Sequence, residues 1–77
     1  MDNRVTDIAI HLDSALPDDQ LTGLEETVRR EPSVISACLS PEDRHILLVT
    51  YDPEGVSSEE LVKRLRARGV HASAFGL

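Results

Sequence analysis

The chain is poor in aromatic and sulfur-containing side chains. Among its 77 residues there is one tyrosine, Tyr51, one phenylalanine, Phe75, and no tryptophan. RNA-binding sheets of the recognition-motif kind need aromatic side chains on which bases stack, so this composition argues against that class. Cys38 is the single cysteine. A lone cysteine excludes an internal disulfide and favours a reducing compartment.

Positive charge and long apolar runs are also scarce. The chain has 8 lysines and arginines against 14 acidic residues, which gives a net charge of −6. Nucleic acids and anionic membranes are bound mainly through basic surfaces, so neither is an expected partner. No apolar run approaches the ~20 residues that span a bilayer, and the first residues lack the order of a signal peptide. We therefore expect a cytoplasmic protein.

Four segments have the composition and periodicity of short β-strands. Residues 5–12 alternate, with Ile8, Ile10 and Leu12 on one face, which is typical of a half-buried strand. Residues 46–51 are apolar on both faces, which favours a central strand. Shorter strands are predicted at 34–39 and 70–75.

Two segments have helical spacing. In the first, Leu21, Leu24 and Val28 recur at intervals of three and four residues. Pro17 suits its first helical position, and Pro32 ends it. The pair Glu25 and Arg29 has the i,i+4 spacing of a solvent-exposed ion pair.

The second predicted helix has signals at both ends. Ser57 and Glu60 have the spacing of a capping box. Leu61, Val62 and Leu65 form its apolar stripe, and Gly69 fits the left-handed residue that follows a helix.

The order strand, helix, strand, strand, helix, strand predicts an α+β fold over residues 1–77. It is the ferredoxin-like βαββαβ sandwich. We expect a four-stranded sheet in the order 4-1-3-2, with both helices on one face and the other face open. Each strand–helix–strand unit makes a right-handed crossover.

Nearly the whole chain resembles heavy-metal-associated domains, the small copper- and zinc-carrying modules of metallochaperones and metal-pumping ATPases. The similar residues are Tyr51-Asp52-Pro53, then Val56-Ser57-Ser58-Glu59-Glu60-Leu61, then Gly69-Val70-His71-Ala72. The family carries Cys-x-x-Cys between its first strand and first helix. The corresponding segment here is Leu16-Pro17-Asp18-Asp19. Leucine and aspartate do not replace the soft thiolates that select monovalent copper. The resemblance implies the fold but not the usual metal transfer.

The histidines offer a different route to a metal. His11 ends the first predicted strand and His71 begins the last. These strands are antiparallel neighbours in the predicted fold, so both imidazoles would point to the open sheet face and meet at one corner. Asp13 or Asp7 would supply a third ligand to zinc or copper. The alternative is two unconnected surface histidines.

The open face is the strongest candidate for an interface. By alternation it presents the apolar side chains of Ala9, Ile46, Leu48, Cys38 and Phe75, with Ile35 as a further candidate. A contiguous apolar patch of this kind indicates a homodimer or a docking surface for another domain. No histidine or basic residue is a sequence neighbour of Cys38, so we predict a packed or partner-covered cysteine and no catalytic residue.

A basic cluster is the local exception to the acidic balance. It consists of Lys63, Arg64, Arg66 and Arg68. One interpretation is a solvated helix face that complements the helix dipole. The other is a docking patch for an acidic protein.

These observations predict a non-enzymatic interaction module that acts through its open sheet face and needs no cofactor. Two alternatives stay open. One is a metal-binding or metal-transport protein that uses His11 and His71. The other is a regulatory domain of the ACT type that binds a small ligand, although the usual Pro-Gly pair of that class is missing.

Overall fold

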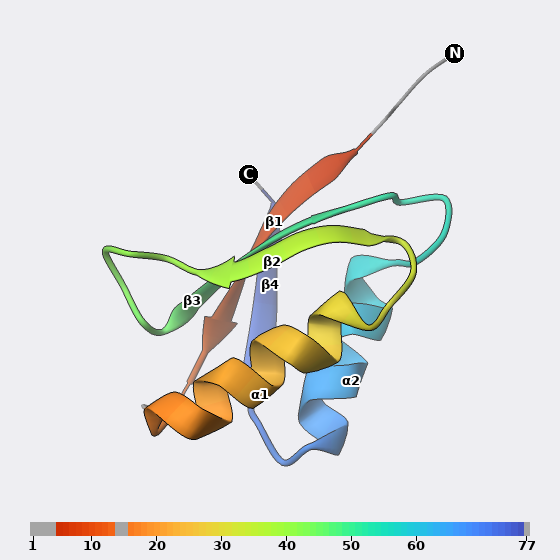
Figure 1. Ribbon diagram of the computed structural model, residues 1–77. Helices are drawn as coiled ribbons and strands as arrows, with labels where there is room; N and C mark the ends of the chain where they lie inside the picture. The colour runs from red at the N-terminus through yellow and green to blue at the C-terminus, as the bar shows by residue number, and fades with distance from the viewer. Residues whose placement is uncertain (1–4, 14–15, 77) are drawn as a thin grey trace.

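The computed structural model describes residues 5–13 and 16–76. Strands and helices follow one another in the predicted order βαββαβ (Figure 1). The elements are β1 (Thr6–Leu12), α1 (Asp18–Arg29), β2 (Val34–Leu39), β3 (Ile46–Tyr51), α2 (Ser58–Ala67) and β4 (Ala72–Gly76).

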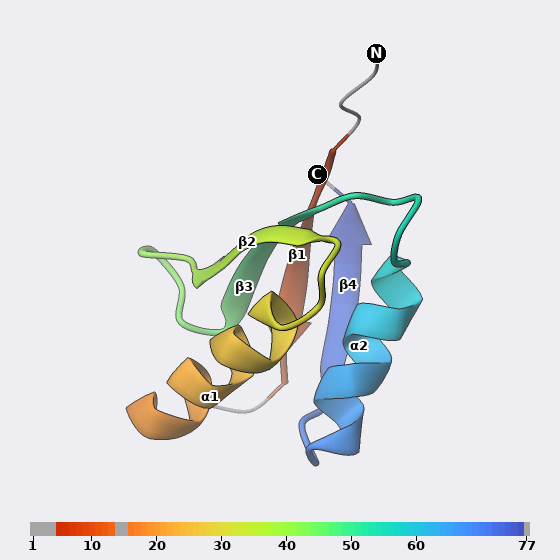
Figure 2. The same cartoon turned by 45° about the vertical axis from the view of Figure 1, so that its right-hand side comes forward.

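The four strands form one sheet in the order β2-β3-β1-β4. Every neighbouring pair is antiparallel. Both helices pack on the same side of this sheet, and the opposite side carries no helix (Figure 2). The predicted ferredoxin-like class and strand order are therefore confirmed.

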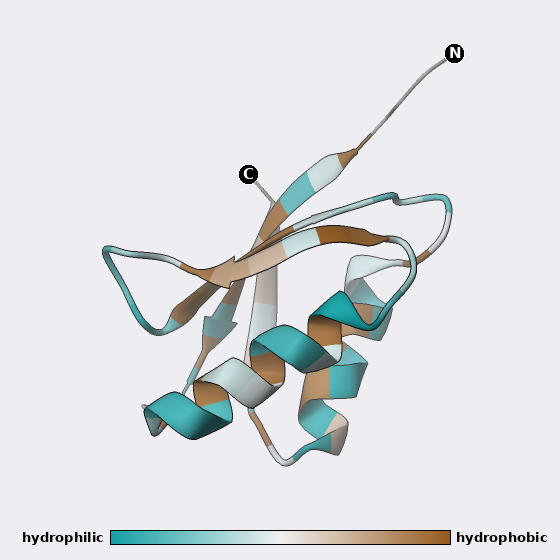
Figure 3. Cartoon of the chain, viewed as in Figure 1, coloured by the Kyte–Doolittle hydropathy of each residue, from teal (hydrophilic) through white to brown (hydrophobic). Residues whose placement is uncertain are grey.

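The core lies between the sheet and the two helices. Alternate side chains of the central strands point into it, and each helix contributes one apolar stripe, as period-two strands and amphipathic helices require. Figure 3 shows these stripes on the helix sides that face the sheet. The core residues of these elements are Ile8, Ile10, Leu12, Leu21, Leu24, Val28, Leu47, Val49, Tyr51, Leu61, Val62 and Leu65.

The helix ends follow local chemistry, with one difference from expectation. Pro17 has an extended backbone (φ −60°, ψ 154°) and is the N-cap of α1 rather than its first residue. Its carbonyl accepts the backbone N–H groups of Gln20 and Leu21, both at 3.0 Å. In α2, Ser57 Oγ accepts the Glu60 N–H at 3.1 Å, as expected for a capping serine. Gly69 is left-handed with φ 82°, as predicted.

Strand β4 differs from its sequence-based range, and β2 contains a bulge within the range predicted for it. The last strand begins at Ala72 rather than residue 70, because the Val70 N–H still donates to the Leu65 carbonyl (3.2 Å) in the turn after α2. In β2 the pairing with β3 shifts between Val34 and Ser36. Ile35 is the extra residue of this bulge and is 62% exposed.

Side chains of α1 cover the outer edge of β2. Arg29 Nε donates to the Ala37 carbonyl at 2.9 Å, and the Leu39 N–H donates to Glu25 Oε2 at 2.9 Å. The interpretation of Glu25 and Arg29 as a solvent-exposed ion pair is thus wrong. Both side chains instead satisfy backbone groups that an edge strand would otherwise leave unpaired.

No helix in the described ranges is both long enough and apolar enough to cross a membrane.

Candidate functional site

One row of side chains crosses the open face of the sheet. Cys38 of β2 pairs with Leu48 of β3, Leu48 pairs with Ala9 of β1, and Ala9 pairs with Phe75 of β4. We call these four residues the apolar row. Phe75 is 56% exposed and Cys38 is exposed, while Leu48 is half-buried and Ala9 is buried. Four of the five residues predicted for the interface therefore lie side by side.

The fifth predicted residue, Ile46, lies on the same strand two positions from Leu48. It pairs with His11, which in turn pairs with Ser73 of β4. On the other side of the apolar row, Thr50 Oγ1 donates to Asp7 Oδ1 at 2.6 Å. The apolar row is thus bordered on one side by the contact of Thr50 with Asp7, and on the other by His11 and its paired residues.

His11 has a ring neighbour that the sequence reasoning did not identify. The rings of His11 and His45 are 6.4 Å apart between centroids, with 25° between their planes. The His11 ring also meets Phe75 edge-on at 6.3 Å. His45 directly precedes β3, and antiparallel pairing with β1 brings it to the end of that strand. His45 lies just outside the strand predicted at 46–51, so no register predicted from the sequence placed it beside His11.

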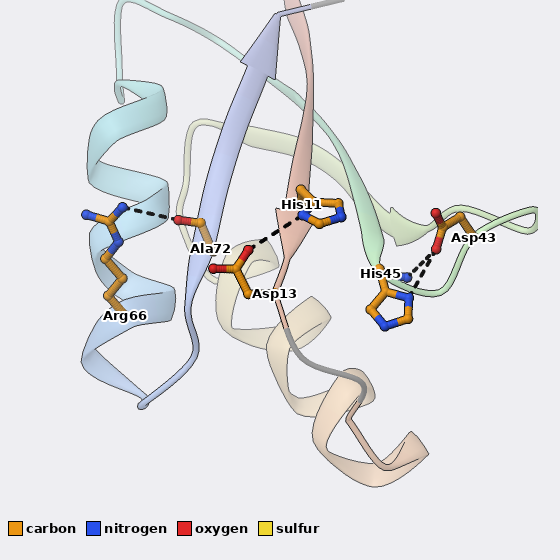
Figure 4. Close-up of polar contacts among 6 residues, drawn as sticks. All are labelled: His11, Asp13, Asp43, His45, Arg66 and Ala72. Carbon is orange, nitrogen blue, oxygen red and sulfur yellow. Dashed lines mark hydrogen bonds and ion pairs between the residues drawn. The ribbon is translucent and has the colours of Figure 1, made fainter.

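Each of these two rings turns one nitrogen towards a carboxylate. His11 Nδ1 lies 3.6 Å from Asp13 Oδ1, and His45 Nδ1 lies 3.3 Å from Asp43 Oδ1 (Figure 4). We call His11, His45, Asp13 and Asp43 the histidine corner.

Hydrogen bonds from His45 lower the pKa of Asp43. The largest cause is the His45 backbone N–H, which donates to Asp43 Oδ1 at 2.9 Å. Partial desolvation opposes this effect. The side-chain hydrogen bond from His45 and the positive charges of His45 and His11 add to it. The carboxylate is therefore held in its charged form beside the two rings.

His71, the other histidine of the predicted pair, lies at the same end of the sheet as His11. It directly precedes β4 and is exposed. Its backbone carbonyl accepts the Asp13 N–H at 3.0 Å, one residue pair beyond the pairing of Leu12 with Ala72. Within residues 5–13 and 16–76, no group of three or more histidine, cysteine or acidic side chains is arranged to hold a metal ion.

The segment that corresponds to the thiolate loop offers no soft ligand in its described residues. Leu16 packs against the hydrophobic core. Asp19 Oδ1 accepts the Gln20 N–H at 3.0 Å, and Asp18 forms an ion pair with Arg44. One aliphatic side chain and two exposed carboxylates do not suit monovalent copper, which prefers sulfur.

The four residues of the predicted basic patch divide between different neighbours. Arg64 Nη2 lies 2.6 Å from Oε2 of Glu31. Arg68 lines a hollow of about 310 Å³ against α1. Lys63 and Arg66 instead border a groove beside β4. The four cations therefore have three different sets of neighbours.

This architecture, with a βαββαβ order and both helices on one sheet face, is the fold of heavy-metal-associated domains. A copper binding domain from HMA7, a P-type ATPase, matches with a TM-score of 0.81 at 15% identity, over 92% of this chain and 95% of that chain. Oxidized MerP from Ralstonia metallidurans CH34 matches with a TM-score of 0.81 at 14% identity, over 92% and 97%. The CopZ metallochaperone matches with a TM-score of 0.78 at 15% identity, over 88% and 100%.

No protein-family model matches the chain, and no curated protein matches it significantly. The likeness to solved structures therefore shows the fold and leaves the function to be argued from the residues.

Proposed function

We propose that the chain is a non-enzymatic protein-docking module that binds its partner through the open face of the sheet. The observation that carries this proposal is the apolar row, which crosses all four strands without a charged side chain. Single exposed apolar residues are ordinary on protein surfaces, whereas a contiguous set on one face favours an interface. Phe75 supplies the largest exposed side chain of the row.

The charges around the row indicate the chemistry of the partner. Asp7 lies on one side of it, and Asp13 and Asp43 belong to the histidine corner on the other. The whole chain also has a net charge of −6. A complementary surface would have an apolar centre and a basic rim, because opposite charges at the rim speed association and exclude wrong partners.

The residues at the thiolate loop support a role other than thiolate-based metal transfer. Leu16 and Asp19 stand where the family carries cysteines, and Cys38 is in β2 rather than in this loop. The proposed module thus retains the scaffold of a heavy-metal-associated domain and uses its sheet face instead of its loop.

Affinity capture followed by binding measurements tests the proposal. The partner captured by the wild-type chain is purified, and its affinity is measured for the wild type, for Leu48→Asp and for Phe75→Ala. We expect a loss of tenfold or more for Leu48→Asp, a smaller loss for Phe75→Ala, and weaker binding at higher salt. Ile35→Asp is the matched control, since Ile35 is exposed but lies outside the row.

Equal affinities of Leu48→Asp and Ile35→Asp for the captured protein would refute the docking role of the row. Phe75→Ala guards against a folding artefact, because this side chain is more than half exposed and its removal leaves the core intact.

A second candidate function, binding of a divalent metal ion, is favoured by the histidine corner. In metal sites the ligating histidine commonly directs its other ring nitrogen to a carboxylate. Here Nδ1 of both His11 and His45 faces an aspartate, which leaves each Nε2 as a potential ligand. Zinc suits imidazole nitrogen, with water completing its coordination.

Zinc titration followed by NMR tests this second candidate. His11→Ala and His45→Ala should each abolish binding, while His71→Ala should retain it. Binding should also weaken below about pH 6, because protonated imidazole does not ligate metal. Loss of binding in His71→Ala but not in His45→Ala would favour the His11 and His71 pair instead. Absence of any zinc-dependent shift would exclude both.

A further inference from the structure

The outer edge of β4 presents backbone groups without a neighbouring strand. The Asp13 N–H donates to the His71 carbonyl, so the backbone of His71 faces β1. Backbone direction alternates along an antiparallel strand, so Ser73 and Phe75 also face β1, while Ala72 and Ala74 face outward. The Ala72 carbonyl does accept a bond from the outer side, from Arg66 Nη2 at 3.2 Å (Figure 4).

The two edges of the sheet differ in how they are covered. At β2, Glu25 and Arg29 bind backbone groups of the outer edge. At β4, the contact from Arg66 reaches only Ala72 among the described residues. The strand sequence Ala-Ser-Ala-Phe-Gly also lacks the lysine or proline that commonly protects an edge. The edge of β4 is therefore the one available for pairing.

A groove runs between this edge and α2. It has a volume of about 520 Å³, and it is lined by Ser58, Glu59, Val62, Lys63, Arg66, Ser73 and Ala74. Helix α2 and strand β4 run in opposite directions (Figure 2). Arg66 accordingly lies at the start of β4, beside Ala72, and Glu59 lies towards its end. The groove is acidic at one end and basic at the other.

We propose that a second copy of this chain occupies the groove and pairs its own β4 antiparallel to the first, about a two-fold axis at Ala74. This self-association goes beyond the proposed docking function, which uses the open face. A two-fold axis reverses the direction of the groove, so Glu59 of each copy faces the partner's Lys63 and the partner's Arg66. The same patch is therefore complementary to itself, as a two-fold interface requires.

The pairing also accounts for the backbone groups of the edge. Ala74 exchanges its N–H and carbonyl with Ala74 of the partner subunit, which satisfies both groups. The Ala72 carbonyl accepts the N–H of the partner's Gly76. Arg66 is then released to bind the partner's Glu59. The side chains of Ser73 and Ala74 are small, so two strands can approach to the usual ~4.8 Å spacing.

In the dimer the open face of each copy stays free, and the two open faces together form one surface. Because the paired strand has only five residues and both copies are acidic, the association should be weak and should reverse on dilution. Sedimentation velocity from micromolar to millimolar protein therefore tests it, with amide hydrogen exchange at Ala74 as the local probe. We expect dimers at the upper concentrations and slower exchange at Ala74 as they form.

Charge reversal separates this edge from other contacts. Arg66→Glu and Glu59→Arg should each weaken self-association tenfold or more, because each places like charges across the two-fold axis. An equimolar mixture of the two variants should form a heterodimer, since both contacts then regain opposite charges. Arg30→Glu is the matched control, with the same change in net charge at an exposed cation after α1. It should dimerise like the wild type.

A chain that stays monomeric at millimolar concentration would overturn the proposal. So would dimers that tolerate Arg66→Glu as well as Arg30→Glu, or a mixture of the reversal variants that fails to associate. Dimers lost in Leu48→Asp but kept in Arg66→Glu would place self-association on the open face instead. The first three outcomes leave the affinity of the open face for a captured partner unchanged, so the two proposals fail separately.

Discussion

Arg64 and Glu31 form an ion pair that links α2 to the turn after α1, with 2.6 Å between Nη2 and Oε2. The Glu31 side chain is only 10% exposed, whereas that of Arg64 is 47% exposed. Burial deprives the Glu31 carboxylate of its interactions with water, and the Arg64 guanidinium replaces them. Glu31 is the one charged residue that is buried in the described part of the chain.

Replacement of Arg64 by alanine should destabilise the fold by about 1–3 kcal/mol, because it leaves the Glu31 carboxylate without its charged partner. The half-exposed arginine keeps this effect below that of a fully buried pair. Urea denaturation measures it, and Lys63→Ala on the exposed side of the same helix is the control. The double variant Arg64→Ala/Glu31→Gln should recover part of the loss. A stability equal to that of Lys63→Ala would show that the pair contributes nothing.

Replacement of three glycines by alanine, one at a time, should change the stability of the fold in different directions. Gly23→Ala should stabilise α1 by about 0.5–1 kcal/mol, since the helix interior favours alanine and the nearest atom to the new Cβ is Arg68 Nη2 at 3.6 Å. Gly55→Ala should destabilise, because its Cβ would overlap the Ser33 side chain. Gly69→Ala should also destabilise, by about 1 kcal/mol, because φ is 82° there.

Thermal unfolding of the three variants checks this ordering. Ser33→Gly should relieve Gly55→Ala when the two are combined, because it removes the atoms that the new Cβ meets. It should not relieve Gly69→Ala, which has open space around the new Cβ and is limited by backbone conformation. Equal effects of the three alanines would contradict the steric argument.

Local patterns predicted the fold and the faces of its strands. Alternation at Ile8, Ile10 and Leu12 placed the core side of β1 correctly, and with it the open side that carries Ala9. Helix stripes and the Ser57 cap are equally local signals. A few apolar residues at regular spacing therefore suffice for the architecture, because their burial drives the packing of every element.

The missed contacts all join residues that are distant in sequence or that lie in turns. Nothing in the sequence around Glu31 or Arg64 indicates that these two residues form an ion pair. His45 lies just outside the strand predicted at 46–51, and only the register of β3 on β1 brings it to His11. Glu25 and Arg29 have the spacing of a helix pair, and only the position of β2 shows that they bind its edge.

The pKa of Asp43 should lie below its usual value of 3.8, and His45→Ala should raise it only part of the way back. The variant removes the side-chain hydrogen bond and the positive charge of His45, but the backbone N–H, which is the largest cause, remains. NMR titration of the carboxyl carbon measures this, with His71→Ala as a control that should leave the value unchanged. A full return to the usual value would show that the ring, not the backbone, sets the pKa.

The same shift has a defined sign for stability. A carboxyl group whose pKa is lower in the folded state stabilises that state above its unfolded pKa. The contribution disappears as the pH falls through the lowered folded value. Asp43→Asn should therefore lose this stabilisation at neutral pH but differ little from the wild type in strong acid.

Removal of the α1 side chains that cover the outer edge of β2 should let the protein associate through this edge as well. The double variant Glu25→Ala/Arg29→Ala frees the Leu39 N–H and the Ala37 carbonyl, which then offer a second edge to another chain. With both edges open, pairing has no natural end, so we expect larger assemblies instead of dimers. Light scattering measures the size of the assemblies, and hydrogen exchange at Leu39 reports whether its N–H has lost its partner.

The control Glu26→Ala/Arg30→Ala changes the next i,i+4 pair, at exposed positions of the same segment. If the first variant stays as small as this control, the α1 side chains do not protect the edge. Arg66→Glu, added to the first variant, should reduce the assemblies to dimers. That result would show that the two edges act independently and that pairing of β4 with β4 joins the dimers into larger assemblies.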